Sequence, residues 1–376
     1  MAALRIVVIT NRFGDVGTHP QLSRLALHLK KSGHDVRAVT LAPPGTIAET
    51  FAEAGIEMDV IDGSRQGSFP LVVGKLTAMF RQTRPDAVVA FLYGAIVPAR
   101  VAARLAGVPA VISSIRNEYF GPRYKEQVIA ATDWLSTRTV VNSQTVAESL
   151  ARRGIASRER LVVIPNGIDT SLFRPSPETR ESTRSGLGVT VDEFLWVTIG
   201  RLTDQKDYPS LFKAFHAVVT DLPRTRLLVI GRGPLQPHLD EQVRRFGLQD
   251  RISFLGFRAD IPSLLAASDA SVMASRWEGM PNAVIEALAS ELPVVGTDVG
   301  GMRELVDDGV DGYLVPPSRP DALASAMLKV MRASSEERVE MGRKGRDLVR
   351  DRCDLERVMS RWRTLIEELM PSRAAQ

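Results

Sequence analysis

Short apolar runs alternate along the chain with segments whose apolar residues recur at helical spacing. The runs at residues 5–10 and 35–40 are typical of strands buried in a parallel sheet, and between them Leu22, Leu25 and Leu29 mark one face of a helix. The order continues with helices expected at 70–83 and 96–105 and strands expected at 56–61, 87–91, 110–114, 136–142 and 161–164. The first half of the chain is therefore predicted to be an α/β domain with a parallel sheet.

The alternation stops between residues 165 and 188 and then resumes. This segment is rich in proline, serine, threonine and charge, and we interpret it as the connection between two domains. A second set of strands is expected at 193–199, 227–230, 252–255, 270–274, 293–297 and 312–315, with helices at 282–290, 321–331, 336–349 and 355–370. We expect domains at residues 1–168 and 169–354, because 376 residues are enough for two hydrophobic cores.

The most informative stretch is residues 275–301. It places Glu278 in a loop with Gly279 and Pro281, and Glu286 inside the following helix, with seven residues between the two acids. The amino end of a helix offers unpaired N–H groups and a positive dipole end, which suit a phosphate, whereas carboxylates accept hydrogen bonds from sugar hydroxyls. The stretch therefore predicts a sugar-nucleotide site; the alternative is a solvated Glu278 and a Glu286 paired with a nearby arginine.

Two further loops follow predicted strands and carry candidate ligand-binding residues. Arg201 and Lys206 lie just past residues 193–199, where two cations can neutralise a pyrophosphate. The first loop of the chain carries Gly14, but its glycine spacing is not that of a dinucleotide fingerprint, so we expect only that a ligand approaches its backbone. His19 in the same loop either touches substrate or caps the following helix.

Positive charge is concentrated in the first half of the chain. Residues 1–168 hold 20 Lys and Arg against 13 Asp and Glu, while the whole chain has a net charge of +4. Phosphate groups or an anionic lipid surface would suit this excess better than nucleic acid, and an arginine-rich solvated surface is the alternative. The loop at 114–127 places Arg116, Arg123 and Lys125 among aromatic residues, which suits a phosphorylated or lipid-linked acceptor or, alternatively, a surface loop anchored by its aromatics.

Other features narrow the expected location and chemistry. Cys353 is the only cysteine, so no intramolecular disulfide can form and a reducing cytoplasm is expected. No apolar run has transmembrane length, and the first residues are typical of a strand rather than a signal peptide. The helix near residues 69–84 could rest on a lipid interface, although packing on the sheet is favoured. The histidines lack metal-ligand spacing and no clustered acids demand a metal, so we expect neither a metal nor a cofactor.

Six ordered pieces of the sequence together resemble the family-4 retaining glycosyltransferases of the GT-B fold. They are PNGID at 165–169, GRLTDQKD at 200–207, GRGP at 231–234, FLGFRAD at 254–260, EGMPNAVIEALA at 278–289 and GGMRELV at 300–306. The resemblance covers the second domain and the domain junction, whereas the first domain matches only in outline. It implies two Rossmann-like domains facing across a cleft, with the C-terminal helix, in residues 355–376, crossing back to the first domain.

The resemblance also implies roles for individual residues. Arg201 and Lys206 would contact the donor pyrophosphate and Glu278 the transferred sugar, which makes these three the candidate catalytic residues, and Glu286 would bind the ribose. The other expected donor-binding residues are Gly14, Gly200, Gly231, Phe257, Arg258, Gly279, Met280, Pro281 and Asn282. The candidate acceptor-binding residues are His19, Arg116, Asn117, Arg123 and Lys125. Many relatives carry a histidine near the reacting sugar where this chain has Arg116 and Asn117, so we do not expect a histidine base there.

The expected activity is the retaining, metal-independent transfer of a hexose or N-acetylhexosamine from a nucleotide sugar to a lipid-linked or cell-envelope glycan. UDP is favoured over GDP as the nucleotide, and the cytoplasm, with peripheral contact to an anionic membrane as an option, is the expected location. Two alternatives stay open: a sugar-nucleotide epimerase of the same fold and a non-catalytic sugar-nucleotide-binding protein. The sequence does not predict the sugar, the acceptor or the linkage.

Overall fold

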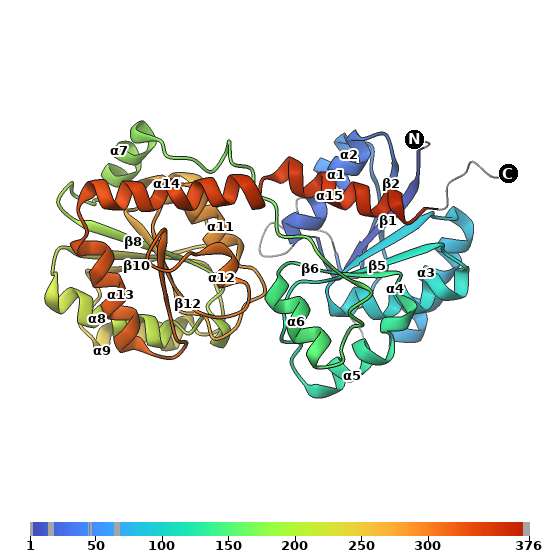
Figure 1. Ribbon diagram of the computed structural model, residues 1–376, viewed down its shortest axis with the longest axis horizontal. Coiled ribbons are helices and arrows are strands. Elements are labelled where there is room, and N and C mark those ends of the chain that lie inside the picture. The colour runs from blue at the N-terminus through green and yellow to red at the C-terminus, as the bar shows by residue number, and fades with distance from the viewer. Residues whose placement is uncertain (1–2, 14–18, 44, 46, 64–67, 371–376) are drawn as a thin grey trace. The chain divides into compact units, whose positions relative to one another are not determined.

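The computed structural model describes residues 3–13, 19–43, 45, 47–63 and 68–370, and the chain divides into two compact units (Figure 1). The first unit contains residues 1–167 and 356–376, and the second contains residues 168–355. Each unit is built on one parallel sheet with helices on both faces. The predicted α/β class is therefore confirmed for both halves of the chain.

The first unit has a seven-stranded sheet with the order β3-β2-β1-β4-β5-β6-β7. Its strands are β1 (Arg5–Thr10), β2 (Asp35–Thr40), β3 (Glu57–Val60), β4 (Ala87–Phe91), β5 (Ala110–Ile115), β6 (Arg138–Val141) and β7 (Leu161–Val163). The central strands β1, β4 and β5 are buried along almost their whole length, which explains why they have continuous apolar sequences rather than alternating ones. The strand order reverses between β1 and β4.

Helices cover both faces of this first sheet. They are α1 (His19–Lys31), α2 (Ile47–Glu53), α3 (Phe69–Thr83), α4 (Tyr93–Ala106), α5 (Arg123–Ala131), α6 (Gln144–Arg152) and α15 (Leu355–Glu368). Figure 1 shows α1, α2 and α15 on one side of the sheet and α3 to α6 on the other. Helix α3 buries Val72, Leu76 and Phe80 in the core between the sheet and α4, so this helix packs on the sheet as the favoured interpretation predicts.

The second unit has a six-stranded sheet with the order β10-β9-β8-β11-β12-β13. Its strands are β8 (Phe194–Ile199), β9 (Thr225–Ile230), β10 (Ile252–Gly256), β11 (Ala270–Met273), β12 (Val294–Thr297) and β13 (Gly312–Val315). Its helices are α7 (Pro177–Gly186), α8 (Tyr208–Asp221), α9 (Gln236–Arg245), α10 (Ile261–Ala267), α11 (Asn282–Ala289), α12 (Met302–Leu305), α13 (Pro320–Arg332) and α14 (Ser335–Arg352). Two apolar clusters, one on each face of the sheet, form its core.

The segment expected to be an irregular connection contains helix α7, so that part of the prediction is wrong. The side chain of Ser176 caps the helix and Pro177 occupies its first turn, both of which favour a helix start. The helix is almost entirely polar and is held by arginines instead of an apolar face: Arg184 and Arg180 both form ion pairs with Asp269. The loop predicted at residues 114–127 is likewise shorter, because α5 begins at Arg123.

Candidate functional site

The strand order of the second sheet reverses between β8 and β11, and the central site residues follow these two strands. Lys206 ends the short 3₁₀ helix η2 (Asp204–Lys206) after β8, and Glu278 lies in the loop after β11. In open parallel sheets the carboxyl ends of the two strands at such a reversal border a crevice that binds ligands. The topology therefore brings together two residues that lie 72 positions apart in the chain.

Lys206 and Glu278 form an ion pair. The Lys206 Nζ donates a hydrogen bond of 2.6 Å to Oε1 of Glu278, and the two side chains are only 16% and 8% exposed. The hydroxyl of Ser275 donates to the same Oε1 at 2.7 Å, while the carbonyl of Ser275 accepts from Oγ1 of Thr297 at 2.6 Å. Ser275 and Thr297 did not stand out in the sequence, where their only signal is a small hydroxyl residue at the end of an apolar strand.

The two loops that carry the ion pair are also joined through their backbones. The Gln205 side chain donates to the carbonyl of Trp277 at 3.0 Å, and the backbone N–H of Arg276 donates to the carbonyl of Gln205 at 2.8 Å. Arg276 also pairs with the buried Asp207 at 3.2 Å. Because these contacts fix one loop against the other, Lys206 and Glu278 are held at short range by more than their own attraction.

Close backbone approaches at the same edge of the sheet require glycine. A Cβ atom on Gly231 would overlap the carbonyl oxygen of Gly200, and a Cβ on Gly300 would overlap the carbonyl oxygen of Glu278. Both glycines have positive φ, 142° for Gly231 and 53° for Gly300, which other residues rarely adopt. The glycines of these motifs in the second domain therefore allow the site loops to contact one another through their backbones.

Further positive groups follow strands of the same sheet, at the edge that carries the Lys206–Glu278 pair. Arg201 follows β8 and Arg232 follows β9; both are exposed, and neither forms an ion pair with any residue that the structure describes. The N–H of Leu202 donates to the carbonyl of Arg232 at 3.1 Å, which joins their loops. Helix α11 begins at Asn282 without a side-chain cap, so its positive dipole end is not countered by a capping side chain. Arg232 is an additional cation that the sequence analysis did not single out.

The other predicted donor-binding residues lie on the same loops or the same helix. Gly279, Met280 and Pro281 are buried between Glu278 and α11, and Asn282 and Glu286 are half-buried on α11 itself. Phe257 and Arg258 follow β10; the Phe257 side chain is 49% exposed, and Arg258 makes two hydrogen bonds to Asp260, of 2.7 and 2.5 Å. Those bonds lower the pKa of the Asp260 carboxyl. Gly14 lies outside the described residues.

In the first unit, Arg116 is buried and has internal partners. Its guanidinium lies 4.7 Å from the centre of the Phe91 ring and 5.3 Å from that of Trp362 on α15, and it donates to Ile164 and Asn166 at 3.2 Å each. Burial lowers the pKa of Arg116 to about 9, and no carboxylate of the described chain offsets this effect. Arg116 therefore joins β5 to α15, through contacts that the sequence alone did not suggest.

The remaining acceptor candidates are spread over the same unit. Asn117 is half-buried and accepts from the N–H of Tyr119 at 3.3 Å. Arg123 is exposed at the start of α5, and the Lys125 ammonium lies 5.4 Å from the centre of the Tyr93 ring. His19 begins α1, and its side chain is not among the described ones. The structure thus places Arg123 and Lys125 together at one helix end and Arg116 in the core.

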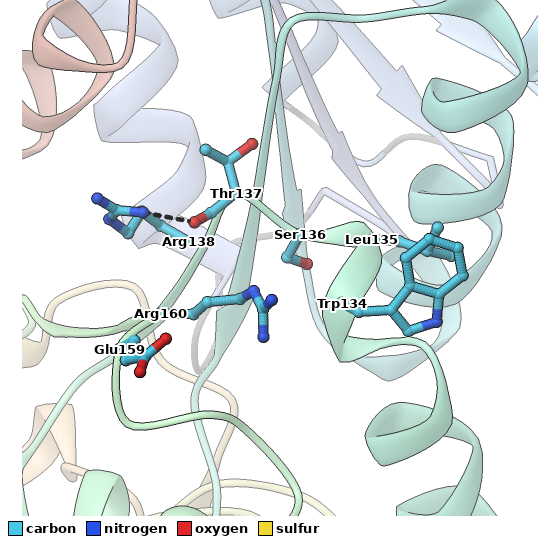
Figure 2. A pocket seen from close by; sticks show the side chains of 7 residues that line it. All are labelled: Trp134, Leu135, Ser136, Thr137, Arg138, Glu159 and Arg160. Carbon is cyan, nitrogen blue, oxygen red and sulfur yellow. Dashed lines mark hydrogen bonds between the residues drawn. The ribbon is translucent and has the colours of Figure 1, made fainter.

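A polar hollow of about 400 Å³ lies elsewhere in the first unit (Figure 2). It is lined by Trp134, Leu135, Ser136, Thr137, Arg138, Glu159 and Arg160. Figure 2 shows the Arg138 guanidinium turned back to the carbonyl of Thr137, a hydrogen bond of 2.8 Å. The lining residues immediately precede or begin β6 and β7, so the hollow lies at the amino ends of these strands, opposite to the edge where parallel sheets bind ligands.

No helix within residues 3–370, apart from the gaps in the description, is both long and apolar enough to cross a membrane. The same part of the chain contains no group of three or more His, Cys, Asp or Glu side chains placed to hold a metal ion.

Comparison with known families matches both halves of the chain. Residues 17–172 match the model described as Glycosyltransferase Family 4, and residues 193–333 match the model described as Glycosyl transferases group 1. The Escherichia coli UDP-Gal:alpha-D-GlcNAc-diphosphoundecaprenol alpha-1,3-galactosyltransferase is 30% identical over 241 residues, which are 61% of this chain and 62% of that relative. The chain thus aligns with less than two thirds of that relative's length.

Two further proteins are similar over more of the chain. The 2-deoxystreptamine N-acetyl-D-glucosaminyltransferase of Streptomyces fradiae is 26% identical over 82% of this chain and 81% of its own length. The crystal structure of Anabaena HepE in complex with UDP-glucose superimposes with a TM-score of 0.86 at 22% identity, over 97% of this chain and 100% of that one. The two sheets and this likeness confirm the predicted fold class, and the chain belongs to the family-4, group-1 glycosyltransferases of the GT-B fold.

Proposed function

We propose that the protein is a retaining glycosyltransferase that takes a hexose or N-acetylhexosamine from a UDP-sugar. The observation that carries this proposal is the placement of Lys206 and Glu278 at 2.6 Å across the strand-order reversal. Arg201 lies on the same segment after β8 as Lys206, and the uncapped amino end of α11 follows the loop that carries Glu278. Cations suit the diphosphate and the carboxylate suits the sugar hydroxyls. The Escherichia coli relative is named for UDP-galactose and the Anabaena structure contains UDP-glucose, which supports UDP over GDP.

The proposed reaction breaks the bond between the anomeric carbon and the β-phosphate oxygen of the donor. An acceptor hydroxyl oxygen forms the new bond to that carbon on the same face, and its proton passes to the departing phosphate oxygen. Negative charge grows on the diphosphate as the bond breaks, so Arg201, Lys206 and the α11 dipole stabilise the transition state more than the ground state. These fixed positive groups can fill the role of a divalent cation.

Single substitutions of the two cations test this role. By analogy with other groups that stabilise a developing anion, we expect Arg201→Ala and Lys206→Ala each to lower kcat by roughly a hundred- to a thousand-fold. Arg224→Ala is the matched control, because Arg224 is an exposed arginine that pairs with Asp192 before β9, at the opposite edge of the sheet. Turnover of the two site variants close to that of the parent, with an unchanged melting temperature, would refute the proposal.

The assay should follow both the released nucleotide and the sugar-bearing product, because this separates the alternatives. A transferase releases UDP and glycosylates an acceptor, an epimerase converts the sugar nucleotide without acceptor, and a binding protein does neither. The sugar can be narrowed first by a thermal-shift screen of UDP- and GDP-sugars, since a ligand that binds only the folded state raises its apparent stability.

The acceptor we propose is a lipid-linked or cell-envelope glycan at the cytoplasmic face of a membrane. The basic first half of the chain and the exposed Arg123, Tyr124 and half-buried Lys125 at the start of α5 support an anionic, lipid-anchored partner. The parent should float with vesicles that contain anionic lipid, and Arg123→Glu should not. Lys213→Glu, an equal charge change at an exposed residue of α8, should still float. No flotation of the parent, with soluble sugars serving equally well as acceptors, would exclude this class of acceptor.

A further inference from the structure

The Lys206–Glu278 ion pair affects how tightly the proposed site holds UDP compared with a UDP-sugar. Both side chains are largely buried, and each is constrained from its far side. The Lys206 stem lies against Gly200, where a Cβ atom would come within 2.9 Å of Cε of Lys206. The Glu278 backbone lies against Gly300, and Ser275 holds the carboxylate. The pair is therefore a fixed part of the site, unlike a mobile surface contact.

Only one oxygen of Glu278 receives these two bonds. Oε1 accepts from both Lys206 and Ser275, at 2.6 and 2.7 Å. A carboxylate has two oxygens with about four acceptor positions, so Oε2 can accept from a sugar hydroxyl without breaking either bond. The Ser275 hydroxyl, fixed in turn by the bond from Thr297 to the Ser275 carbonyl, sets which oxygen faces Lys206.

The same ammonium is the proposed contact of the donor diphosphate, so a diphosphate and Glu278 share one cation. An ammonium has three N–H donors and can bond to both, but the two anions then lie close together in a site of low exposure, where they repel. A donor sugar offsets this repulsion because its hydroxyls donate to Glu278. A nucleoside diphosphate without the sugar has no such compensation.

We infer that Glu278 is an internal competitor for the diphosphate site, which makes the site favour UDP-sugar over UDP and expels UDP after transfer. This inference rests on the proposed function, since it assigns a product-release role to the same site. Ser275 is a positioning residue in this scheme: it contacts no substrate and acts by orienting the carboxylate.

Binding of UDP and of UDP-sugars, measured by calorimetry, tests the inference. Glu278→Gln keeps the shape and the acceptor oxygen but removes the charge. We expect this variant to bind UDP about five-fold more tightly than the parent, a gain of about 1 kcal/mol, the upper range for a pair that is not fully buried. The preference for UDP-glucose, UDP-galactose or UDP-N-acetylglucosamine over UDP should fall by the same factor or more.

Two further variants separate this effect from structural ones. Ser275→Ala should also narrow the preference for UDP-sugar over UDP, because the carboxylate loses its second anchor, and Ser275→Thr should restore it. Asp221→Asn removes one negative charge from an exposed pair with Arg332 and should leave UDP affinity unchanged.

The outcomes distinguish this inference from the proposed function. If folded Glu278→Gln binds UDP no more tightly than the parent, the competitor role is wrong while the donor site stands. If the parent binds neither UDP nor any of the three UDP-sugars, the proposed donor class falls, and the competitor role falls with it.

Discussion

Gly300 offers the sharpest test of how the site loops are held. An alanine there meets two problems: its φ of 53° lies in the left-handed region, and its Cβ would lie 2.0 Å from the carbonyl oxygen of Glu278. The backbone conformation alone costs about 1–2 kcal/mol. Because Cβ atoms essentially never come closer than 3.0 Å to another heavy atom, one loop must also move by about 1 Å.

That movement has a direct route to the candidate catalytic residue. The N–H of Gly301 donates to the carbonyl of Gly279 at 2.7 Å, so the loop after β12 is tied to the residue next to Glu278. A displacement of 1 Å at a reacting centre can cost about a hundred-fold in rate. We therefore expect Gly300→Ala to lower kcat/KM by about a hundred-fold. Its free energy of unfolding should fall by more than the cost of the backbone conformation alone.

Gly309→Ala is the matched control. Gly309 also has a positive φ, 78°, but a Cβ there meets nothing within 4 Å. The Gly309→Ala variant should lose about 1–2 kcal/mol of unfolding free energy, or roughly 2–8 °C in Tm for a unit of this size, and should keep its activity. Calorimetry and initial rates with the identified UDP-sugar measure both effects. If the two variants match in Tm and in kcat/KM, the clash with Glu278 has no consequence and the reasoning is refuted.

Two further predictions concern buried charges. Arg100→Met should lower the free energy of unfolding by about 3–5 kcal/mol in urea titrations, because it leaves the buried Asp133 without its innermost cation. Arg138 is partly exposed and has no carboxylate partner in the described chain, so Arg138→Met should change the free energy of unfolding little. Burial raises the pKa of Asp311 to about 6, above its ordinary 3.8, so the folded chain binds this proton more tightly than the unfolded chain. The free energy of unfolding should therefore fall by up to about 3 kcal/mol as the pH rises from about 4 to 7. If the free energy of unfolding of Asp311→Asn falls with pH as steeply as that of the parent, this assignment is contradicted.

The parallel sheets could be predicted from sequence because buried strands have continuous apolar runs, as in β4 and β11. Helix α7 could not, because its stability comes from Arg180 and Arg184 reaching Asp269, some 85 to 89 positions away, and not from an apolar face. Sequence periodicity carries no information on such contacts. The same limitation applies to Arg100, which looks like a solvated helix residue but is fully buried.

The candidate site shows a similar division. Glu278 and Lys206 could be found from their positions after strands, and the strand order then explains why they meet. Ser275 and Thr297 could not, since a hydroxyl residue at a strand end has many possible partners. Arg116 was grouped with Arg123 and Lys125 because of its charge, whereas the structure places it against Phe91 and Trp362. Charge in a sequence indicates a chemical group but not the direction in which its side chain points.

The return of residues 356–376 to the first unit affects how the chain can fold during synthesis. The second unit is continuous, so all its strands leave the ribosome before the first unit has received Trp362, the aromatic partner of Phe91 and Arg116. Until α15 arrives, Phe91 lacks its contact with Trp362, and the part of this sheet face that α15 covers beside α1 and α2 stays exposed. The half that is translated first is therefore the half that completes its core last, and during that interval its exposed apolar surface favours aggregation.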